Sequence, residues 1–192
     1  MIKTRFANLD DIDEVKKIID EGISQDYYSI ETIRNYITDE NSMLLVVVSE
    51  DDKPQAAMFC VMGPLKQMCE EEHIPYPDPI FDKYNENTQT IVYKTASTYK
   101  NVRNKGYVTR LFDAYGEIFD KTEHELRVGL ALVLPDGTIP IKKQVDNAGF
   151  TPRKLFKSPW SKIKSYCNYC NNEYCKCNGM LYIKENNSEE KI

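Results

Sequence analysis

The sequence predicts a mixed α/β fold in which amphipathic helices cover a central sheet. Two observations support this prediction. Short apolar stretches with the length of strands alternate along the chain with segments whose apolar residues recur at helical spacing. Hydrophobic residues make up 41% of the 192 residues, which is enough for a sizeable core and too many for a disordered chain.

The N-terminal segment predicts a strand followed by two helices. Residues 2–7 are expected to form the strand, and Asp10 or Asp11 is expected to cap the first helix. Ser29 is expected to open a second, short helix. Both helices carry apolar residues at helical spacing. These residues are Ile12, Val15, Ile19 and Ile23 in the first helix, and Ile30, Ile33 and Ile37 in the second.

A hairpin and a long acidic connection follow. Residues 43–48 and 55–62 are apolar strands on either side of a polar turn, and together they predict a hairpin. Residues 63–87 then break the pattern with four prolines and an acid run at 70–72. A structureless stretch of this length is unusual in a compact domain and is often functional. We expect an inserted acidic loop with one short helix at about residues 65–72.

The second half of the chain predicts four more strands and two helices. The helix after residue 106 is the best defined, because five large apolar residues between Val108 and Phe119 lie on one of its faces. Gly149 is expected to follow the next helix with a positive φ angle. The strands are expected at residues 90–98, 126–134, 150–156 and 180–184, and the second helix at about 139–147.

A basic turn precedes the best-defined helix. Arg103, Asn104, Lys105 and Gly106 lead directly into the helix at Tyr107. A helix N-terminus presents unpaired N–H groups and about half a positive charge, so it binds phosphate well. The glycine lets a ligand approach the backbone closely. Taken alone, this turn also fits an ordinary helix start with solvated basic residues.

The order of the elements and two short motifs resemble the GNAT acetyltransferase superfamily. Its core signature, Arg/Gln-x-x-Gly-x-Gly/Ala between the fourth strand and the third helix, is similar to Arg-Asn-Lys-Gly-Tyr-Val at residues 103–108. The Arg and the first Gly match, whereas Val108 replaces the final small residue. Gly-Phe at residues 149–150 matches the pair that follows the family's fourth helix, and residues 10–15 resemble its first helix. The resemblance covers about residues 1–156.

The resemblance implies the GNAT fold, a mixed central sheet flanked by helices, and an N-acetyltransferase that uses acetyl-CoA as cosubstrate. It implies that main-chain N–H groups of the turn bind the CoA pyrophosphate. It also implies that Thr98 and Tyr99 bond the pantetheine and help polarise the thioester carbonyl. The implied cofactor-binding residues are Thr98, Tyr99, Arg103, Asn104, Lys105, Gly106, Tyr107 and Val108. A primary amine would attack the thioester directly, after losing a proton.

The resemblance does not assign the residues that act as general acid and general base. Many family members have a Tyr four residues before the Gly-Phe, and the matching residue here is Val145. Tyr93, the acid run at 70–72 and His73 are candidates by their chemistry alone. A His beside three acids is also typical of a solvated loop.

Four of the six cysteines fall within eleven residues, and the sequence predicts that they bind zinc. They are Cys167, Cys170, Cys175 and Cys177. In a reducing compartment, clustered cysteines more often bind metal than form disulfides. Four thiolates complete the tetrahedral shell of a structural Zn²⁺, and the loop is too short for a core of its own. We predict a zinc knuckle at residues 158–179, between the last two strands, with an iron–sulfur site or free thiols as alternatives.

The two insertions are expected to lie at the same end of the sheet. In the GNAT layout, the connections that hold residues 63–87 and 158–179 both lie at the acceptor end. We therefore expect both to border the acceptor site, opposite the CoA phosphates. The chain is expected to be a single GNAT domain over residues 1–192, with these two insertions.

The charge is uneven along the chain. The net charge is −5, yet residues 142–164 carry seven Lys or Arg against one acid. An acidic body favours a cationic amine acceptor. Two other interpretations remain. The basic segment also contains Phe156 and Trp160, which suits a nucleic-acid-binding module. Val108 and Val145 suit a catalytically silent GNAT fold that senses acyl-CoA.

The sequence predicts a cytoplasmic protein without membrane contact. No apolar run approaches the roughly 20 residues that a membrane span needs. Residues 1–5 lack the apolar core and the small-residue cleavage site of a signal peptide. The sequence says nothing of the acceptor's identity, the acyl chain length or the oligomeric state.

Overall fold

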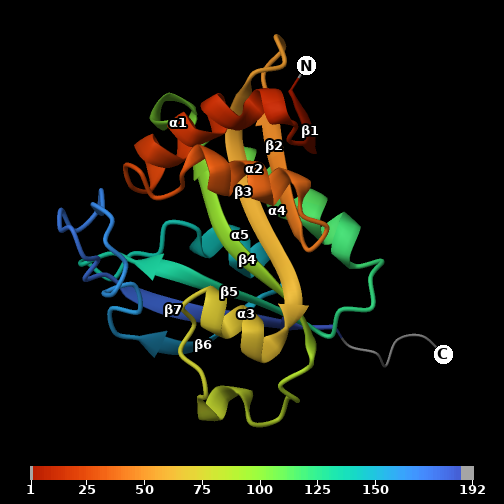
Figure 1. The fold of residues 1–192 in the computed structure, drawn as a ribbon, viewed down its shortest axis with the longest axis vertical. Helices are drawn as coiled ribbons and strands as arrows, with labels where there is room; N and C mark the ends of the chain where they lie inside the picture. Colours follow the sequence, from red (N-terminus) through yellow and green to blue (C-terminus); the bar gives the residue numbers. More distant parts are fainter. Residues whose placement is uncertain (1, 187–192) are drawn as a thin grey trace.

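A seven-stranded mixed sheet organises residues 2–186, the part of the chain that this computed structural model describes (Figure 1). In chain order its strands are β1 (Lys3–Phe6), β2 (Ser42–Val48), β3 (Pro54–Pro64), β4 (Gln89–Thr98), β5 (Leu126–Val133), β6 (Thr151–Phe156) and β7 (Asn178–Glu185). The α-helices of this part are α1 (Ile12–Gly22), α2 (Ile30–Thr38), α3 (Leu65–Glu71), α4 (Tyr107–Phe119) and α5 (Lys142–Asn147). In space the strand order is β1-β2-β3-β4-β5-β7-β6. Only β4 and β5 pair in parallel.

Helices cover both faces of the sheet. In Figure 1, α1, α2 and α3 lie in front of the strands, and α4 and α5 lie behind them. Successive residues of β2 point to opposite faces, so Val46 packs with α1 and α2 while Val47 packs with α4. Burial on both sides explains why this strand is uniformly apolar. Among the described residues, no helix combines the length and apolar character that crossing a membrane requires.

The start of α1 differs from the prediction. The first cap is Asn8, whose side chain accepts a hydrogen bond from Asp10 N in a 3-10 turn, Leu9–Asp11, that precedes α1. The Asp11 carboxylate instead accepts from Asn8 N at 2.8 Å and pairs with Arg5 at 2.7 Å. Asp11 therefore stands at the N-cap position of α1, as predicted, but its side chain makes no capping bond to this helix because it bonds back to Asn8 in the preceding 3-10 turn.

Helix α2 follows the predicted cap residue, Ser29, but only part of its predicted apolar face is buried. The Ser29 hydroxyl oxygen accepts a hydrogen bond from Thr32 N at 3.0 Å, which confirms the predicted cap. Ile33 is fully buried, whereas Ile30 is 46% exposed. Side chains lean towards the N-terminus of their helix, so the side chain of the first helical residue extends past the end of α2.

The C-terminal half contains the predicted helices and strands, but the bounds of α5 and β7 differ from the predicted ones. Helix α5 starts at Lys142, because its N–H bonds to Ile139 O and residues 139–141 form a tight turn instead. Gly149 has the predicted positive φ of 80°. Strand β7 is longer than predicted, since residues 178–185 pair with all of β5. The predicted short helix in the acidic connection is α3.

Helix α4 is held against the sheet by a buried tyrosine. The Tyr115 hydroxyl donates to the carbonyl oxygens of Met43 and Met58, both at 2.8 Å, and accepts from Leu45 N at 3.2 Å. The side chain is fully buried. These bonds join α4 to β2 and β3, so they fix the position of the helix whose N-terminus follows the basic turn.

Candidate functional site

Strands β4 and β5 separate halfway along their length. They pair only from Thr90–Tyr93 with Leu126–Gly129. Beyond these pairs β4 continues to Thr98 and β5 to Val133. On its other side, β4 stays paired with β3 as far as Thr98. The second half of β4 therefore presents a free edge towards β5, and a cleft opens between the two strands.

An extra residue in β4 accounts for this separation. Cys60 of β3 faces Tyr93, but the next residue, Phe59, faces Thr95. Lys94 is therefore a bulge residue without a partner of its own on β3. A bulge bends its strand and increases its twist. Because the pairing with β5 ends at the residue before the bulge, the bend directs the rest of β4 away from β5.

A cavity of about 540 Å³ occupies the gap between the two strands. Six of the eight predicted cofactor-binding residues line it: Thr98, Arg103, Asn104, Gly106, Tyr107 and Val108. The other two do not. Tyr99 lies against α1, where its hydroxyl donates to Glu14 Oε1 at 2.6 Å, and Lys105 is exposed.

The N-terminus of α4 faces open space in this cavity. Gly106 precedes the helix with a φ of +79°, and no side chain caps the N–H groups of the first turn. A Cβ atom added to Gly106 would meet nothing within 4 Å. Asn104 also has a positive φ, of 63°. The turn thus leaves room beside unpartnered N–H groups, the arrangement that binds phosphate.

A second cavity of about 170 Å³ adjoins the first on the face of α1, α2 and α3. The two share Tyr27, Tyr93, Lys94, Leu130, Trp160 and Ile163. Glu72 and His73, at the end of α3, line the smaller cavity. Glu71 bonds to Gln67 on the exposed side of the helix instead. Of the acidic candidates in the sequence, the fold brings only Glu72 to the cavities, together with His73.

Glu72 and Lys94 form a largely buried ion pair where the two cavities meet. The ammonium lies 2.5 Å from Glu72 Oε2, and the side chains are 8% and 15% exposed. Burial alone would lower the pKa of Lys94, but the Glu72 carboxylate and the Tyr36 hydroxyl outweigh it and raise the pKa. The ammonium also lies 5.2 Å from the centre of the Tyr36 ring. Sequence analysis missed Lys94, although a lone charge within an apolar strand was a usable signal.

Tyr93 is enclosed by aromatic rings. Its ring centroid lies 4.9 Å from that of Phe150 and 5.6 Å from that of Phe112. Burial raises the pKa of Tyr93, so its phenol stays protonated. Its hydroxyl is close enough to the buried Arg127 for the guanidinium to offset part of this rise.

A second phenol stands at the branch point of the cleft. Tyr182 of β7 is the cross-strand partner of Gly129, the last residue of β5 that pairs with β4. It lines the large cavity and packs in the same core cluster as Val145. Burial raises the pKa of Tyr182, which keeps the phenol protonated. No local sequence pattern indicated Tyr182, because only strand pairing brings residue 182 to residue 129.

Gln144 of α5 also lines the large cavity. Its Oε1 atom is buried and has no hydrogen-bond partner among the described residues. A buried amide oxygen without a partner is costly, so it marks a place for a donor N–H from a ligand or a water.

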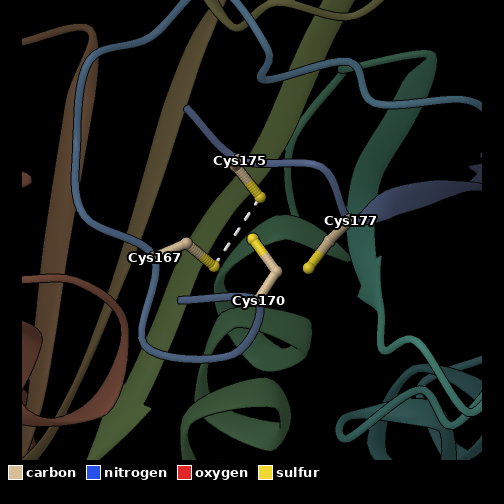
Figure 2. Close-up of side chains that lie close together, drawn as sticks. All are labelled: Cys167, Cys170, Cys175 and Cys177. Atoms are coloured by element: carbon tan, nitrogen blue, oxygen red, sulfur yellow. Dashed lines mark hydrogen bonds between the residues drawn. The ribbon is translucent and has the colours of Figure 1, made fainter. Parts of the chain in front are cut away.

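The four clustered cysteines converge as predicted (Figure 2). The four sulfur atoms all lie within 4.8 Å of one another, and all four cysteines are free thiols. Cys175 Sγ donates to Cys167 Sγ at 3.7 Å, and this bond lowers the pKa of the Cys167 thiol. Four soft ligand atoms at these separations are suited to a metal ion.

The connection between β6 and β7, residues 157–177, carries the four cysteines and is called the cysteine segment below. It lies nearer to the basic turn than predicted. Cys167, Tyr169 and Cys175 line the same cavity as Arg103 and Asn104. The expectation that this insertion lies opposite the turn was therefore wrong. The reason is that the segment bonds to the end of α1, beside the open end of the cleft.

The basic segment has structural contacts of its own. Phe156 is buried in the core, and Trp160 lines both cavities. Lys154 pairs with Asp78 at 2.6 Å, and Arg153 with Glu185 at 3.4 Å. Both aromatic rings that suggested base stacking therefore belong to the core or to the cleft.

Comparison with known proteins identifies the fold. No model of a known protein family matches the chain, and no curated protein matches it in sequence. Solved structures do match. NAA60 of Arabidopsis thaliana with a bisubstrate analogue superposes with a TM-score of 0.70 at 12% identity, over 96% of this chain and 98% of that chain. The ribosomal-protein-S18-alanine N-acetyltransferase of Escherichia coli gives 0.63 at 6% identity, over 96% and 94%.

A third solved structure is also an acetyltransferase. The GNAT superfamily phosphinothricin acetyltransferase of Sinorhizobium meliloti, in complex with acetyl-CoA, gives a TM-score of 0.62 at 10% identity, over 96% of this chain and 88% of that chain. The chain therefore has the GNAT fold that its motifs implied, with the cysteine cluster between the last two strands.

The buried ion pair yields a stability prediction. Lys94→Met leaves the Glu72 carboxylate buried without a partner, and we expect it to lower the free energy of unfolding by about 3 kcal/mol. Glu72→Gln leaves the ammonium unpartnered and should also destabilise. The double variant should lose less free energy of unfolding than the two single variants together, because neither charge is then buried without its partner. Urea denaturation of the four proteins measures the coupling.

An exposed ion pair supplies the control. Lys142 pairs with Asp146 on the surface of α5. Lys142→Met should leave the unfolding free energy nearly unchanged, because water already solvates both groups. Additive effects of the Lys94 and Glu72 substitutions would contradict the pairing.

Proposed function

We propose that this protein is an acetyl-CoA-dependent N-acetyltransferase that acetylates a primary amine. The observation that carries this proposal is the cleft between the diverging β4 and β5, with an uncapped helix N-terminus beside it. Solved structures with the same fold hold acetyl-CoA or CoA, which supports the same cosubstrate here.

The CoA pyrophosphate is proposed to bind at the start of α4. The first-turn N–H groups of this helix lack a side-chain cap, and Gly106 leaves space beside them. Arg103 lines the same cavity and adds positive charge. Val108, where the family has Gly or Ala, still supplies its N–H group, so main-chain binding does not depend on its side chain.

The pantetheine arm is proposed to lie between the two strands. Beyond Tyr93, the edge of β4 that faces β5 has no strand partner, so its backbone groups are available to the amides of the arm. On the α5 side, Gln144 Oε1 is buried without a partner and can accept from a pantetheine N–H. Thr98, at the end of β4, lines the same path. The thioester would then reach the branch point at Gly129.

The acceptor amine is proposed to enter through the smaller cavity. Its nitrogen attacks the thioester carbonyl carbon, the C–N bond forms, and the C–S bond breaks. The amine must lose a proton, and Glu72 and His73 are the groups lining this cavity that can take one. The net charge of −5 favours an acceptor that is cationic before it loses this proton.

Tyr182 is proposed to protonate the departing thiolate. The family's usual Tyr position is Val145 in this chain, which has no proton to give. Tyr182 lies in the same core cluster, lines the large cavity and pairs with Gly129 at the branch point. Its raised pKa keeps the phenol protonated, so a proton is present when the thiolate leaves.

We also propose that the cysteine cluster binds Zn²⁺ in a structural role. Tetrahedral zinc with sulfur at about 2.3 Å requires sulfur separations of about 3.8 Å. The Cys167 and Cys175 sulfurs are 3.7 Å apart, and all four lie within 4.8 Å of one another. Four thiolates fill the shell and leave no open position for water, so the ion would stabilise the segment without taking part in acyl transfer.

Gly106→Ala tests the pyrophosphate site. The new methyl group would occupy the space beside the α4 N-terminus and strain a residue whose φ is +79°. We expect the dissociation constant for acetyl-CoA to rise at least about tenfold. Isothermal titration calorimetry measures the change. Gly137→Ala is the matched control, because Gly137 has a φ of +85° and open space around it but does not line the cavity.

Tyr182→Phe tests the proton donor. We expect kcat to fall by about 100-fold, with little change in acetyl-CoA affinity. Release of the CoA thiol is followed with polyamines, aminoglycosides and peptide N-termini as acceptors. Full activity of the variant would remove Tyr182 from the mechanism. If the wild-type protein binds acetyl-CoA and acetylates none of these amines, the acyl-CoA sensor becomes the better interpretation.

Elemental analysis tests the metal. We expect about one zinc per chain in the wild-type protein and loss of the metal in Cys170→Ser. Cys69→Ser is the control, since Cys69 is a buried residue of α3 and is not one of the four clustered cysteines. Iron with visible absorbance would instead identify an iron–sulfur site. Absence of bound metal in protein purified without chelator would leave four free thiols.

A further inference from the structure

The cysteine segment caps the C-terminal end of α1. Asn168 Nδ2 donates to the carbonyl oxygens of Asp20 at 3.1 Å and Glu21 at 3.4 Å. The Tyr169 hydroxyl donates to Gly22 O at 3.0 Å. The last carbonyl groups of a helix have no partner within the helix. Here side chains from a segment nearly 150 residues away in the sequence supply those partners.

Main-chain contacts reinforce this cap. Asn168 N donates to Ile23 O at 3.4 Å, and Ser24 forms an isolated β-bridge with Cys167, itself one of the four clustered cysteines. The Ser24 hydroxyl also bonds to the Tyr166 carbonyl oxygen. The ligand loop and the first residues after α1 are therefore joined directly.

The C-terminal end of α1 also packs against strand β4. A Cβ atom added to Gly22 would lie 1.9 Å from Ser97 Oγ of β4, so only glycine allows this approach. Ser97 Oγ donates to Ile18 O at 3.0 Å. The end of α1 is thus held between β4 and the cysteine segment. The connection that follows carries Tyr27, which lines both cavities.

Within the cysteine segment, an isolated β-bridge joins Lys164 to Tyr174, and a few main-chain hydrogen bonds close its turns. Residues 157–177 contain no helix or strand. The large side chains of Tyr166 and Tyr174 are 50% and 47% exposed. A segment of this kind gains its structure from cross-links rather than from a core. The four converging thiols are the cross-link that the described residues offer.

We propose that the zinc-bound cysteine segment is a clamp that fixes the end of α1 and the Tyr27 connection as one wall of the acceptor cavity. This inference rests on the proposed zinc site and does not depend on catalysis. Zinc holds Cys167 and its neighbours in place, and Asn168 and Tyr169 transmit this order to α1. The pyrophosphate site at α4 is built on a different helix, so it keeps its structure when the metal is removed.

Hydrogen–deuterium exchange is measured for three variants and the wild-type protein. It distinguishes the effect of the metal from the effect of the side-chain bonds to α1. Cys175→Ser removes one zinc ligand. The double variant Asn168→Ala/Tyr169→Phe keeps all four thiols and removes the side-chain bonds to α1. Tyr174→Phe, which alters a half-exposed phenol in the same segment, is the matched control. Zinc content and acetyl-CoA affinity are measured on each sample.

We expect zinc removal, or Cys175→Ser, to speed exchange in residues 19–28 at least about tenfold, with the β3 and β4 core unchanged. The double variant should keep its zinc and show the same faster exchange. Acetyl-CoA affinity is recorded for each sample but does not decide this test, because Tyr169 and Cys175 line the cavity proposed for acetyl-CoA.

Two results would overturn the clamp. One is unchanged exchange of residues 19–28 in the zinc-free protein. The other is wild-type protection in the zinc-loaded double variant. None of these measurements needs turnover, so a protein that acetylates no amine would still pass or fail this test.

Discussion

The rest of the site depends on one extra residue in β4. Lys94 has no partner on β3, because Tyr93 and Thr95 face consecutive residues of that strand. The strand bends at this bulge, and its pairing with β5 ends at the residue before it. If the two strands stayed hydrogen-bonded to their ends, the cavity of about 540 Å³ between them would close. The space proposed for acetyl-CoA is therefore a consequence of strand register.

The same residue also organises the smaller cavity. A buried ammonium needs a partner, and Glu72 at the end of α3 supplies it. Tyr36 packs beside the ammonium from α2. The long connection over residues 63–87 is consequently not a free loop, because its helix packs on the sheet and Glu72, which follows this helix, is paired with the bulge residue Lys94. Two helices, α2 and α3, therefore meet strand β4 at one charge.

The cysteine segment completes the cleft from outside. It bonds to the last carbonyl groups of α1, and Cys167 and Cys175 line the same cavity as Arg103. The basic residues before it, which also suit a nucleic-acid-binding surface, here include Lys154, paired with Asp78. The basic turn, the end of α1 and the four cysteines are therefore neighbours around one cleft, rather than features of separate sites.

The sequence by itself determined the order of strands and helices, the turn at residues 103–108 and the four clustered thiols, because each depends on residues close together in the chain. It did not reveal the strand bulge at Lys94, the position of Tyr182 or the contact of Asn168 with α1. These depend on pairings such as Gly129 with Tyr182, and on a helix end meeting a distant loop. Such contacts are set by register and packing across the whole sheet, which no local pattern encodes. Only the tertiary structure could decide them.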